Sequence, residues 1–196
     1  MLVLVIGLVI FFGVHSIRMF APEWREKAMH REGSLRWKLR FGMITLIATG
    51  FIIIGYSQLR FAPTWLWFPP MWTRHLSALL MLVALFFAGS AFIENSTMKN
   101  KMGYPFLISV KVWTLAHLLS NGTLADVILF GSFLVWAVVG FAVYRRRDRK
   151  AGVVYKTSTL SSLRPNLVAM VFALVSWIMI VFHLHQALIG VPVFVS

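Results

Sequence analysis

The sequence predicts an all-α membrane protein, a polytopic bundle of six transmembrane helices, and two observations lead to this prediction. Of the 196 residues, 59% are hydrophobic and only 13% are charged, with a mean hydropathy of +0.80. Several uncharged runs are also long enough to cross about 30 Å of hydrocarbon. Their residues do not alternate as strand residues would, and an open sheet cannot satisfy its backbone in lipid. We therefore expect helices, within one transmembrane domain over residues 1–196.

Six apolar runs mark the predicted spans, at residues 2–17, 41–59, 75–93, 102–125, 127–144 and 165–190. Lys111 is the single charged residue inside any of them. The first run is sixteen residues long, which is short for a span. No basic segment precedes it and no small-residue cleavage site follows it, so we expect a retained helix and not a signal sequence.

The basic residues are distributed unevenly between the connections. Of the nineteen Lys and Arg, sixteen lie in the first, third and fifth connections, two in the second and none in the fourth. By the positive-inside rule, the odd-numbered connections are cytoplasmic and both termini lie on the non-cytoplasmic side. We expect the basic run at residues 145–150 to touch anionic lipid of the bilayer, and we expect no nucleic-acid partner.

The residue inventory excludes several kinds of site. The chain has no cysteine, so it has no disulfide, no thiolate-bound zinc or iron-sulfur cluster, and no covalently attached c-type haem. Its six carboxylates lie in or beside the connections, which argues against paired-carboxylate catalysis and di-iron sites. A metal or cofactor in the membrane would therefore depend mainly on histidine.

The six histidines differ in their expected depth. His30 lies in the basic first connection and His75 lies at the edge of the third span, so both have ordinary interfacial explanations. The candidates for ligands lie inside the predicted spans and are His15, His117, His183 and His185. A single histidine in a membrane helix often serves only to hydrogen-bond between helices. Two imidazoles from different helices at a common depth would suit a metal or a haem iron.

Helical spacing groups other polar residues with two of these histidines. Trp113, His117 and Asn121 are spaced by four, so a regular helix would place them on one face, with Lys111 about a third of a turn away. His15 and Arg18 are three apart on a face of the first span. Arg18 and Lys111 could meet an acidic group, such as a haem propionate, or simply extend toward the headgroups. His183 and His185 are two apart, so a regular helix cannot point both at one site.

Several motifs resemble those of the NnrU family of integral membrane proteins, and the resemblance covers nearly the whole chain. The matching segments are residues 15–18 (HSIR), Ala21-Pro22, residues 111–122 (KVWTLAHLLSNG) and residues 130–133 (FGSF). That family is associated with bacterial nitrogen-oxide metabolism and is similar to plant 15-cis-zeta-carotene isomerases, which are haem b proteins. The resemblance implies a multi-pass protein of the bacterial inner membrane, with His15 and His117 as axial haem ligands.

One segment departs from the family pattern. Relatives commonly carry Arg-His-Pro at the start of the fourth span, where this chain has Gly103-Tyr104-Pro105. Tyr104 could replace that histidine as a hydrogen-bond donor or as an iron ligand. The departure weakens any function that needs the missing imidazole. It also argues against the isoprenylcysteine-type methyltransferases, which use an Arg-His-Pro signature followed by acidic residues in a late helix, because the sixth span here has no acidic residue.

Two functional hypotheses follow, and both predict haem b. In the first, the protein supports a nitrite or nitric oxide reductase system without itself being an enzyme. In the second, it is an isomerase in which loss of one axial ligand opens the iron to a lipophilic polyene. A membrane scaffold with no cofactor is the third possibility.

Overall fold

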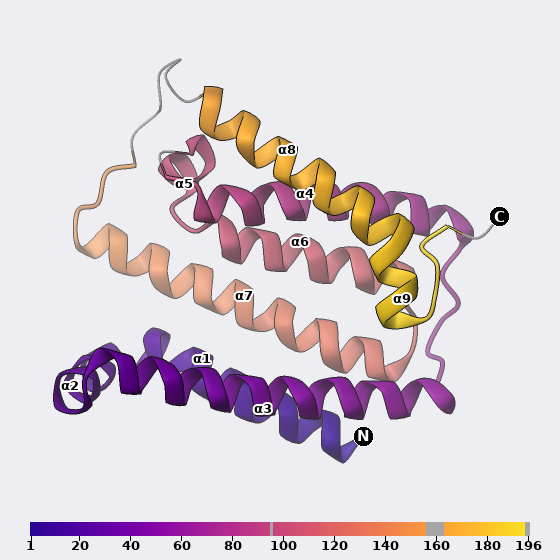
Figure 1. Ribbon diagram of the computed structural model, residues 1–196, viewed down its shortest axis with the longest axis horizontal. Coiled ribbons are helices and arrows are strands. Elements are labelled where there is room, and N and C mark those ends of the chain that lie inside the picture. Colours follow the sequence, from indigo (N-terminus) through magenta and orange to yellow (C-terminus); the bar gives the residue numbers. More distant parts are fainter. Residues whose placement is uncertain (95, 156–162, 195–196) are drawn as a thin grey trace. The chain divides into compact units, whose positions relative to one another are not determined.

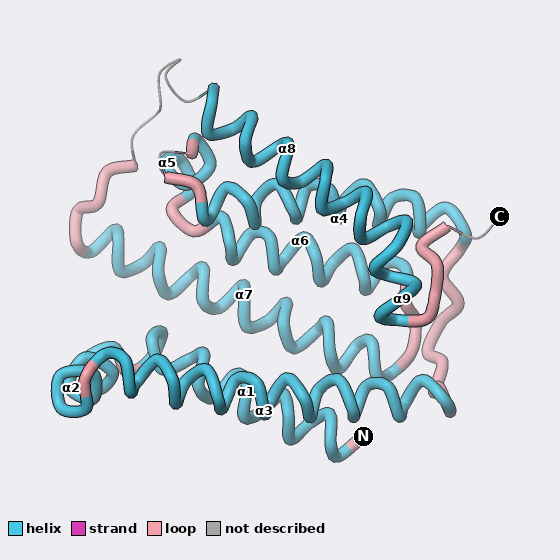
Figure 2. The backbone as a smooth tube through the Cα atoms, viewed as in Figure 1, coloured by secondary structure: helices cyan, strands magenta, loops and turns pink. Residues whose placement is uncertain are grey.

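The computed structural model describes residues 1–94, 96–155 and 163–194, which are almost entirely helical (Figures 1 and 2). The helices are, in chain order, α1 (Leu2–Phe20), α2 (Pro22–Glu32), α3 (Ser34–Phe61), α4 (Met71–Phe92), α5 (Thr97–Met102), α6 (Pro105–Ser120), α7 (Leu124–Lys150), α8 (Leu163–Met179), the π-helical turn η2 (Ile180–Leu184) and α9 (His185–Ile189). They form two compact units, one comprising Met1–Leu66 with Thr123–Ser132 and the other Trp67–Gly122 with Phe133–Ser196.

The first unit is built on a close pairing of α1 with α3 (Figure 1). Gly7 on α1 approaches the α3 backbone so closely that an added Cβ would lie 2.7 Å from the Ile52 nitrogen. Gly55 on α3 approaches the backbone of Leu4 in the same way, and Leu4 itself is fully buried. Small residues let membrane helices pack backbone to backbone, because apolar side chains gain nothing by leaving lipid. The two glycines therefore set the spacing of this helix pair.

The second unit is organised around α4, which packs against both α6 and α8. Side-chain hydrogen bonds to backbone carbonyls join these helices. The Ser77 hydroxyl of α4 donates to the Ala116 carbonyl of α6 at 2.6 Å, and the Trp177 indole of α8 donates to the Ala78 carbonyl of α4 at 2.6 Å. Near the start of α8, Asn166 both accepts from the Thr97 backbone and donates to the Thr97 hydroxyl.

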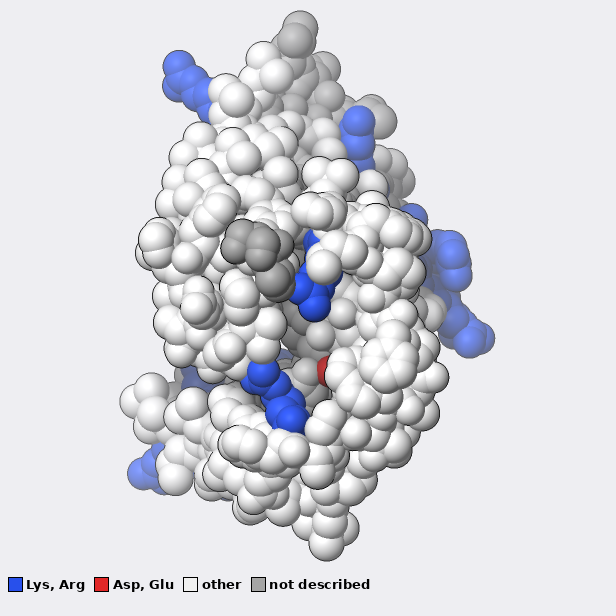
Figure 3. Space-filling view, turned by 90° about the vertical axis from the view of Figure 1, so that its right-hand side faces the viewer, with Lys and Arg blue, Asp and Glu red and all other residues white. Residues whose placement is uncertain are grey.

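The prediction of an all-helical, multi-pass membrane protein is confirmed. Five helical stretches are long and apolar enough to cross a bilayer, namely Leu2–Phe20, Ser34–Phe61, Met71–Phe92, Leu124–Lys150 and Leu163–Ile189. Many large apolar side chains on them are exposed, among them Val9 at 67% and Leu46 at 73%. The face drawn in Figure 3 is accordingly mostly neither basic nor acidic. The sides of the membrane on which the termini lie stay a prediction.

The fourth predicted span is shorter than expected. We predicted residues 102–125, whereas α6 comprises only the sixteen residues Pro105–Ser120, or about 24 Å at the usual helical rise. Gly103 precedes it at φ 77°, a left-handed conformation that interrupts any continuation from α5. Asn121 is extended, and a new helix begins at Leu124. The helix therefore stops before Asn121, the residue expected to complete its polar face.

Two local structures were not predicted. The polar first connection forms the helix α2, which starts at Pro22, a residue whose fixed φ suits the first helical turn. The last span contains the π-helical turn η2, which places His183 inside an irregular turn. The rule of regular helical spacing applied to His183 and His185 therefore does not hold there.

Candidate functional site

His15 lies in the first unit, on α1, and is held by a backbone carbonyl. Its Nδ1 is 2.7 Å from the carbonyl oxygen of Phe11, one turn earlier. The imidazole stacks on the Phe11 ring at 4.0 Å between centroids and 13° between planes, and the Phe41 ring of α3 lies 5.0 Å away. The side chain is half-buried. The Phe11 carbonyl and two aromatic rings thus orient the imidazole.

His117 lies in the second unit, on α6, and repeats this arrangement. Its Nδ1 is 2.9 Å from the carbonyl oxygen of Trp113, again one turn earlier. The Trp113 ring lies 5.4 Å from the imidazole and meets Phe133 edge to face at 5.5 Å. His117 is also half-buried. The predicted pairing of Trp113 with His117 on one helix face is therefore confirmed.

The carbonyl contacts determine the tautomer of both rings. A carbonyl oxygen can only accept a hydrogen bond, so each Nδ1 must carry the hydrogen. In a neutral imidazole the lone pair then resides on Nε2, the nitrogen that points away from the helix backbone. Histidines that bind metals typically have their second nitrogen bonded to a carbonyl or a carboxylate in this way. Within its own unit, each of His15 and His117 therefore has the tautomer that could bind a metal ion through the lone pair on Nε2.

The other predicted site residues are Arg18, Lys111 and Asn121, and each has different surroundings. Arg18 is exposed on the last turn of α1. Lys111 of α6 places its ammonium 3.9 Å from the centroid of the Phe141 ring of α7. Asn121 is outside the regular helix, contrary to the prediction, but its side-chain amide donates to the His117 carbonyl at 2.8 Å and so caps α6. Asn121 therefore stabilises the end of the helix that carries His117.

The remaining histidines have less protected positions. His30, His75 and His183 are exposed. His185 has its Nδ1 2.6 Å from the Val191 carbonyl, and His75 stacks on Phe194 at 5.3 Å. Within residues 1–94, 96–155 and 163–194, no group of three or more His, Asp or Glu side chains is arranged to hold a metal ion.

The structure also reveals a polar cluster at the end of α7 that the sequence analysis did not find. The Tyr104 hydroxyl donates to Asp148 at 3.0 Å, and the Tyr155 hydroxyl donates to the other carboxylate oxygen. Tyr104 further stacks on Tyr144 at 5.0 Å. Partial burial, followed by the bond to Asp148, raises the pKa of Tyr155. Tyr104 therefore serves as a hydrogen-bond donor, one of the two roles expected for it, toward a carboxylate 44 residues away.

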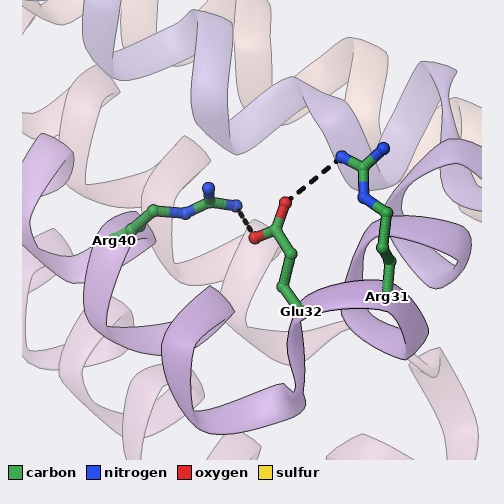
Figure 4. Close-up of polar contacts among 3 residues, drawn as sticks. All are labelled: Arg31, Glu32 and Arg40. Atoms are coloured by element: carbon green, nitrogen blue, oxygen red, sulfur yellow. Dashed lines mark hydrogen bonds and ion pairs between the residues drawn. The ribbon is translucent and has the colours of Figure 1, made fainter.

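Two further carboxylates in the first unit have structural roles. Asp126 is 4% exposed and accepts from the Tyr56 hydroxyl at 2.5 Å and from both the backbone and the hydroxyl of Thr123. Thr123 in turn accepts from the Asp126 backbone, which closes a capping box at the start of α7. Glu32 pairs with Arg31 and with Arg40, which joins α2 to α3 (Figure 4). A Thr three residues before Asp is a visible cap pattern, but the partner Tyr56 has no local sequence signature.

Comparison with known proteins identifies a family. The family model described as NnrU protein matches residues 3–193, nearly the whole chain. No curated protein and no solved structure matches the chain.

Proposed function

The chain belongs to the NnrU family, and on that premise we propose that it is a membrane protein that holds haem b and supports nitrogen-oxide metabolism. His15 and His117 are the proposed axial ligands. In this role the protein is not itself a reductase but contributes to a nitrite or nitric oxide reductase system. When bound, haem would supply a one-electron redox centre within the membrane.

The observation that supports the proposal is that two imidazoles on different helices have the same tautomer, fixed by the same kind of contact with a backbone carbonyl. Each has its Nδ1 within 2.9 Å of the carbonyl oxygen one turn earlier, so each has its lone pair on Nε2. Bis-histidine ligation of haem iron needs two neutral imidazoles of this tautomer. It does not need a third ligand from the chain, so the absence of a three-residue cluster among the described residues is compatible with it. The donor set therefore fits the cofactor.

Other residues have supporting roles in the same proposal. Trp113 offers a flat aromatic surface beside His117, and Asn121 fixes the end of α6 through the His117 carbonyl. Arg18 and Lys111 are the proposed partners of the two propionates. A charge-assisted contact of that kind stabilises a complex by roughly 1.5 to 3 kcal/mol. Replacing Arg18 with alanine should therefore weaken haem retention during purification without abolishing it.

Absorption spectra of the purified protein, oxidised and reduced, test the cofactor directly. The wild-type protein, produced with ample haem, should show a low-spin spectrum with a split visible band on reduction. His15→Ala and His117→Ala should each lose this spectrum. His30→Ala is the matched control, because His30 is exposed in α2 and should leave the spectrum intact. Equal spectra from all three variants would reject the ligand assignment, and no spectrum in the wild type would leave a membrane scaffold.

A separate experiment tests the role in metabolism. In a nitrite-reducing host that lacks this protein, the wild-type gene should restore nitrite consumption and His117→Ala should not.

Supplying the purified, reduced protein with a cis-polyene tests the alternative function, that of an isomerase. An unchanged isomer ratio supports the accessory role, whereas turnover of the polyene would identify an isomerase.

A further inference from the structure

The end of α7 carries a buried guanidinium nitrogen with no described hydrogen-bond partner. Within the described part of the chain, Arg145 Nη1 is one of three buried side-chain atoms in this condition, and the other two are the hydroxyls of Thr45 and Ser90. Arg145 is the only charged group of the three. An unpaired charged donor shielded from water costs far more free energy than an unpaired hydroxyl. An acceptor from outside the chain would remove this cost.

The residues around Arg145 hold its side chain in place without neutralising it. The guanidinium carbon lies 4.3 Å from the centroid of the Tyr155 ring. Tyr155 reaches this position because the chain turns back after α7 at Gly152, which has φ 67°. The Val153 backbone then donates to the Asp148 carbonyl at 2.9 Å, which fastens the turn. The guanidinium also hydrogen-bonds to the Tyr155 hydroxyl. Tyr155 thus orients the guanidinium through its ring and its hydroxyl, but it supplies no negative charge and leaves Nη1 without an acceptor.

The nearest acidic residue along the helix is already engaged. Asp148 accepts hydrogen bonds from the hydroxyls of Tyr104 and Tyr155, one on each carboxylate oxygen. No ion pair joins Arg145 to a carboxylate of the described residues. Apart from Arg145 and Asp148, the residues of the run at 145–150 are all basic, namely Arg146, Arg147, Arg149 and Lys150. An anion arriving here would therefore meet concentrated positive charge.

We propose that Arg145 is the centre of a binding site for a phosphate group, and that the phosphate is the headgroup of an anionic phospholipid. A planar guanidinium matches phosphate oxygens with two parallel hydrogen bonds, which suits a group held flat by an aromatic ring. The position fits lipid because Arg145 follows directly on the apolar part of a helix long enough to cross a bilayer, and the headgroups of a bilayer lie where such an apolar part ends. The Arg145 residue as a whole is half-buried although Nη1 is buried, so a phosphate oxygen can reach the guanidinium and draw Nη1 into a hydrogen bond.

Lipid retention by the full-length protein tests this site. Native mass spectrometry would count the phospholipids that stay bound after exchange into micelles doped with phosphatidylglycerol or with phosphatidylcholine. The wild type should retain phosphatidylglycerol about tenfold more strongly, and Arg145→Ala should lose most of that preference. The matched control is Arg149→Ala, which removes the same charge from an exposed position of the same helix and should lose less than about twofold.

Two further variants separate the charge of Arg145 from the shape of its guanidinium, and a second probe separates a lipid headgroup from free phosphate. Arg145→Lys keeps the charge but loses the planar fork, so it should behave like Arg145→Ala, and Arg145→Gln serves if the alanine variant fails to fold. Thermal unfolding with inorganic phosphate distinguishes the source of the anion. Greater protection by phosphatidylglycerol supports a headgroup, whereas greater protection by free phosphate would overturn that assignment. Equal losses in the Arg145→Ala and Arg149→Ala proteins would overturn the site itself and leave only general attraction between basic residues and lipid.

Discussion

The two units hold their histidines by the same local device but pack their helices by different means. His15 and His117 each have Nδ1 against a carbonyl one turn earlier, and each has an aromatic side chain on that earlier residue. Around His15, glycines bring the backbones of α1 and α3 together. Around His117, the helices are joined by hydrogen bonds from side chains to carbonyls, such as that from Ser77 to Ala116. The orientation of a ligand can therefore be encoded within one helix turn, independently of how that helix is packed.

The largest expected effect concerns the glycine contact of the first unit. In Gly55→Ala, the new Cβ would collide with the backbone of Leu4, which cannot move aside as a flexible side chain would. We expect a loss of about 1 to 3 kcal/mol in the free energy of unfolding, measured by thermal unfolding in detergent. Gly13→Ala is the control, because a Cβ at Gly13 meets nothing within 4 Å. It should be neutral or stabilising by up to about 1 kcal/mol, and a similar loss in both variants would contradict glycine-mediated packing.

The corresponding change in the second unit should be smaller. Ser77→Ala removes the hydroxyl that donates to the Ala116 carbonyl and should cost about 0.5 to 1.5 kcal/mol of unfolding free energy. Ser120 donates to the same carbonyl at 3.1 Å from within α6, so Ser120→Ala tests the acceptor without affecting the contact with α4. We expect Ser120→Ala to cost less. The reverse order in thermal unfolding would mean that the bond between helices is not what stabilises this pair.

A smaller effect is expected at the end of the helix that carries His117. Asn121→Ala removes the side-chain bond to the His117 carbonyl but keeps the backbone bond to the same oxygen at 2.9 Å. The loss in unfolding free energy should stay below about 1 kcal/mol, and the haem spectrum should persist. Loss of the spectrum with unchanged stability would show that Asn121 contacts the cofactor directly, which would distinguish this unit further from the first.

The smallest effect is a pH dependence in the second unit. The Tyr155 pKa is raised above its ordinary value of 10.0. At a pH just above 10, the phenol therefore keeps its hydrogen in the folded protein but loses it in the unfolded chain. Its stabilising bond to Asp148 should be fully present below about pH 10 and should be lost as the pH rises through the raised pKa. Tyr155→Phe should remove this dependence. Parallel unfolding curves for the two proteins from about pH 8 to pH 11 would contradict the assignment.

Much of the fold could be predicted because apolar runs are the dominant requirement for crossing lipid. The limits of the spans were less predictable, although Gly103, Pro105 and Asn121 are residues that commonly end or begin helices. Overall apolarity outweighs these local indications in residues 102–125, so the sequence predicts a single span there. The helix α2 was missed because its composition is strongly polar, and apolar runs reveal only helices that are buried or in contact with lipid.

The sequence was enough to select candidate site residues, but not to predict their hydrogen bonds. His15, His117 and Trp113 could be selected from depth, spacing and family resemblance. The carbonyl bonds to Nδ1 depend on side-chain rotamers, which sequence spacing does not specify. The approach of Tyr104 to Asp148 depends on how α6 and α7 meet over 44 residues of separation, which no local pattern contains.

The π-helical turn within the last span has a consequence for how that span can change in length. Such a turn is equivalent to an α-helix with one residue inserted. Deleting one residue within Ile180–Leu184 should therefore yield an ordinary helix whose two flanks keep their directions. The same deletion elsewhere in the span would rotate everything beyond it by about 100° and turn lipid-facing residues inward. Relatives that differ by one residue in this span should carry the difference at this turn.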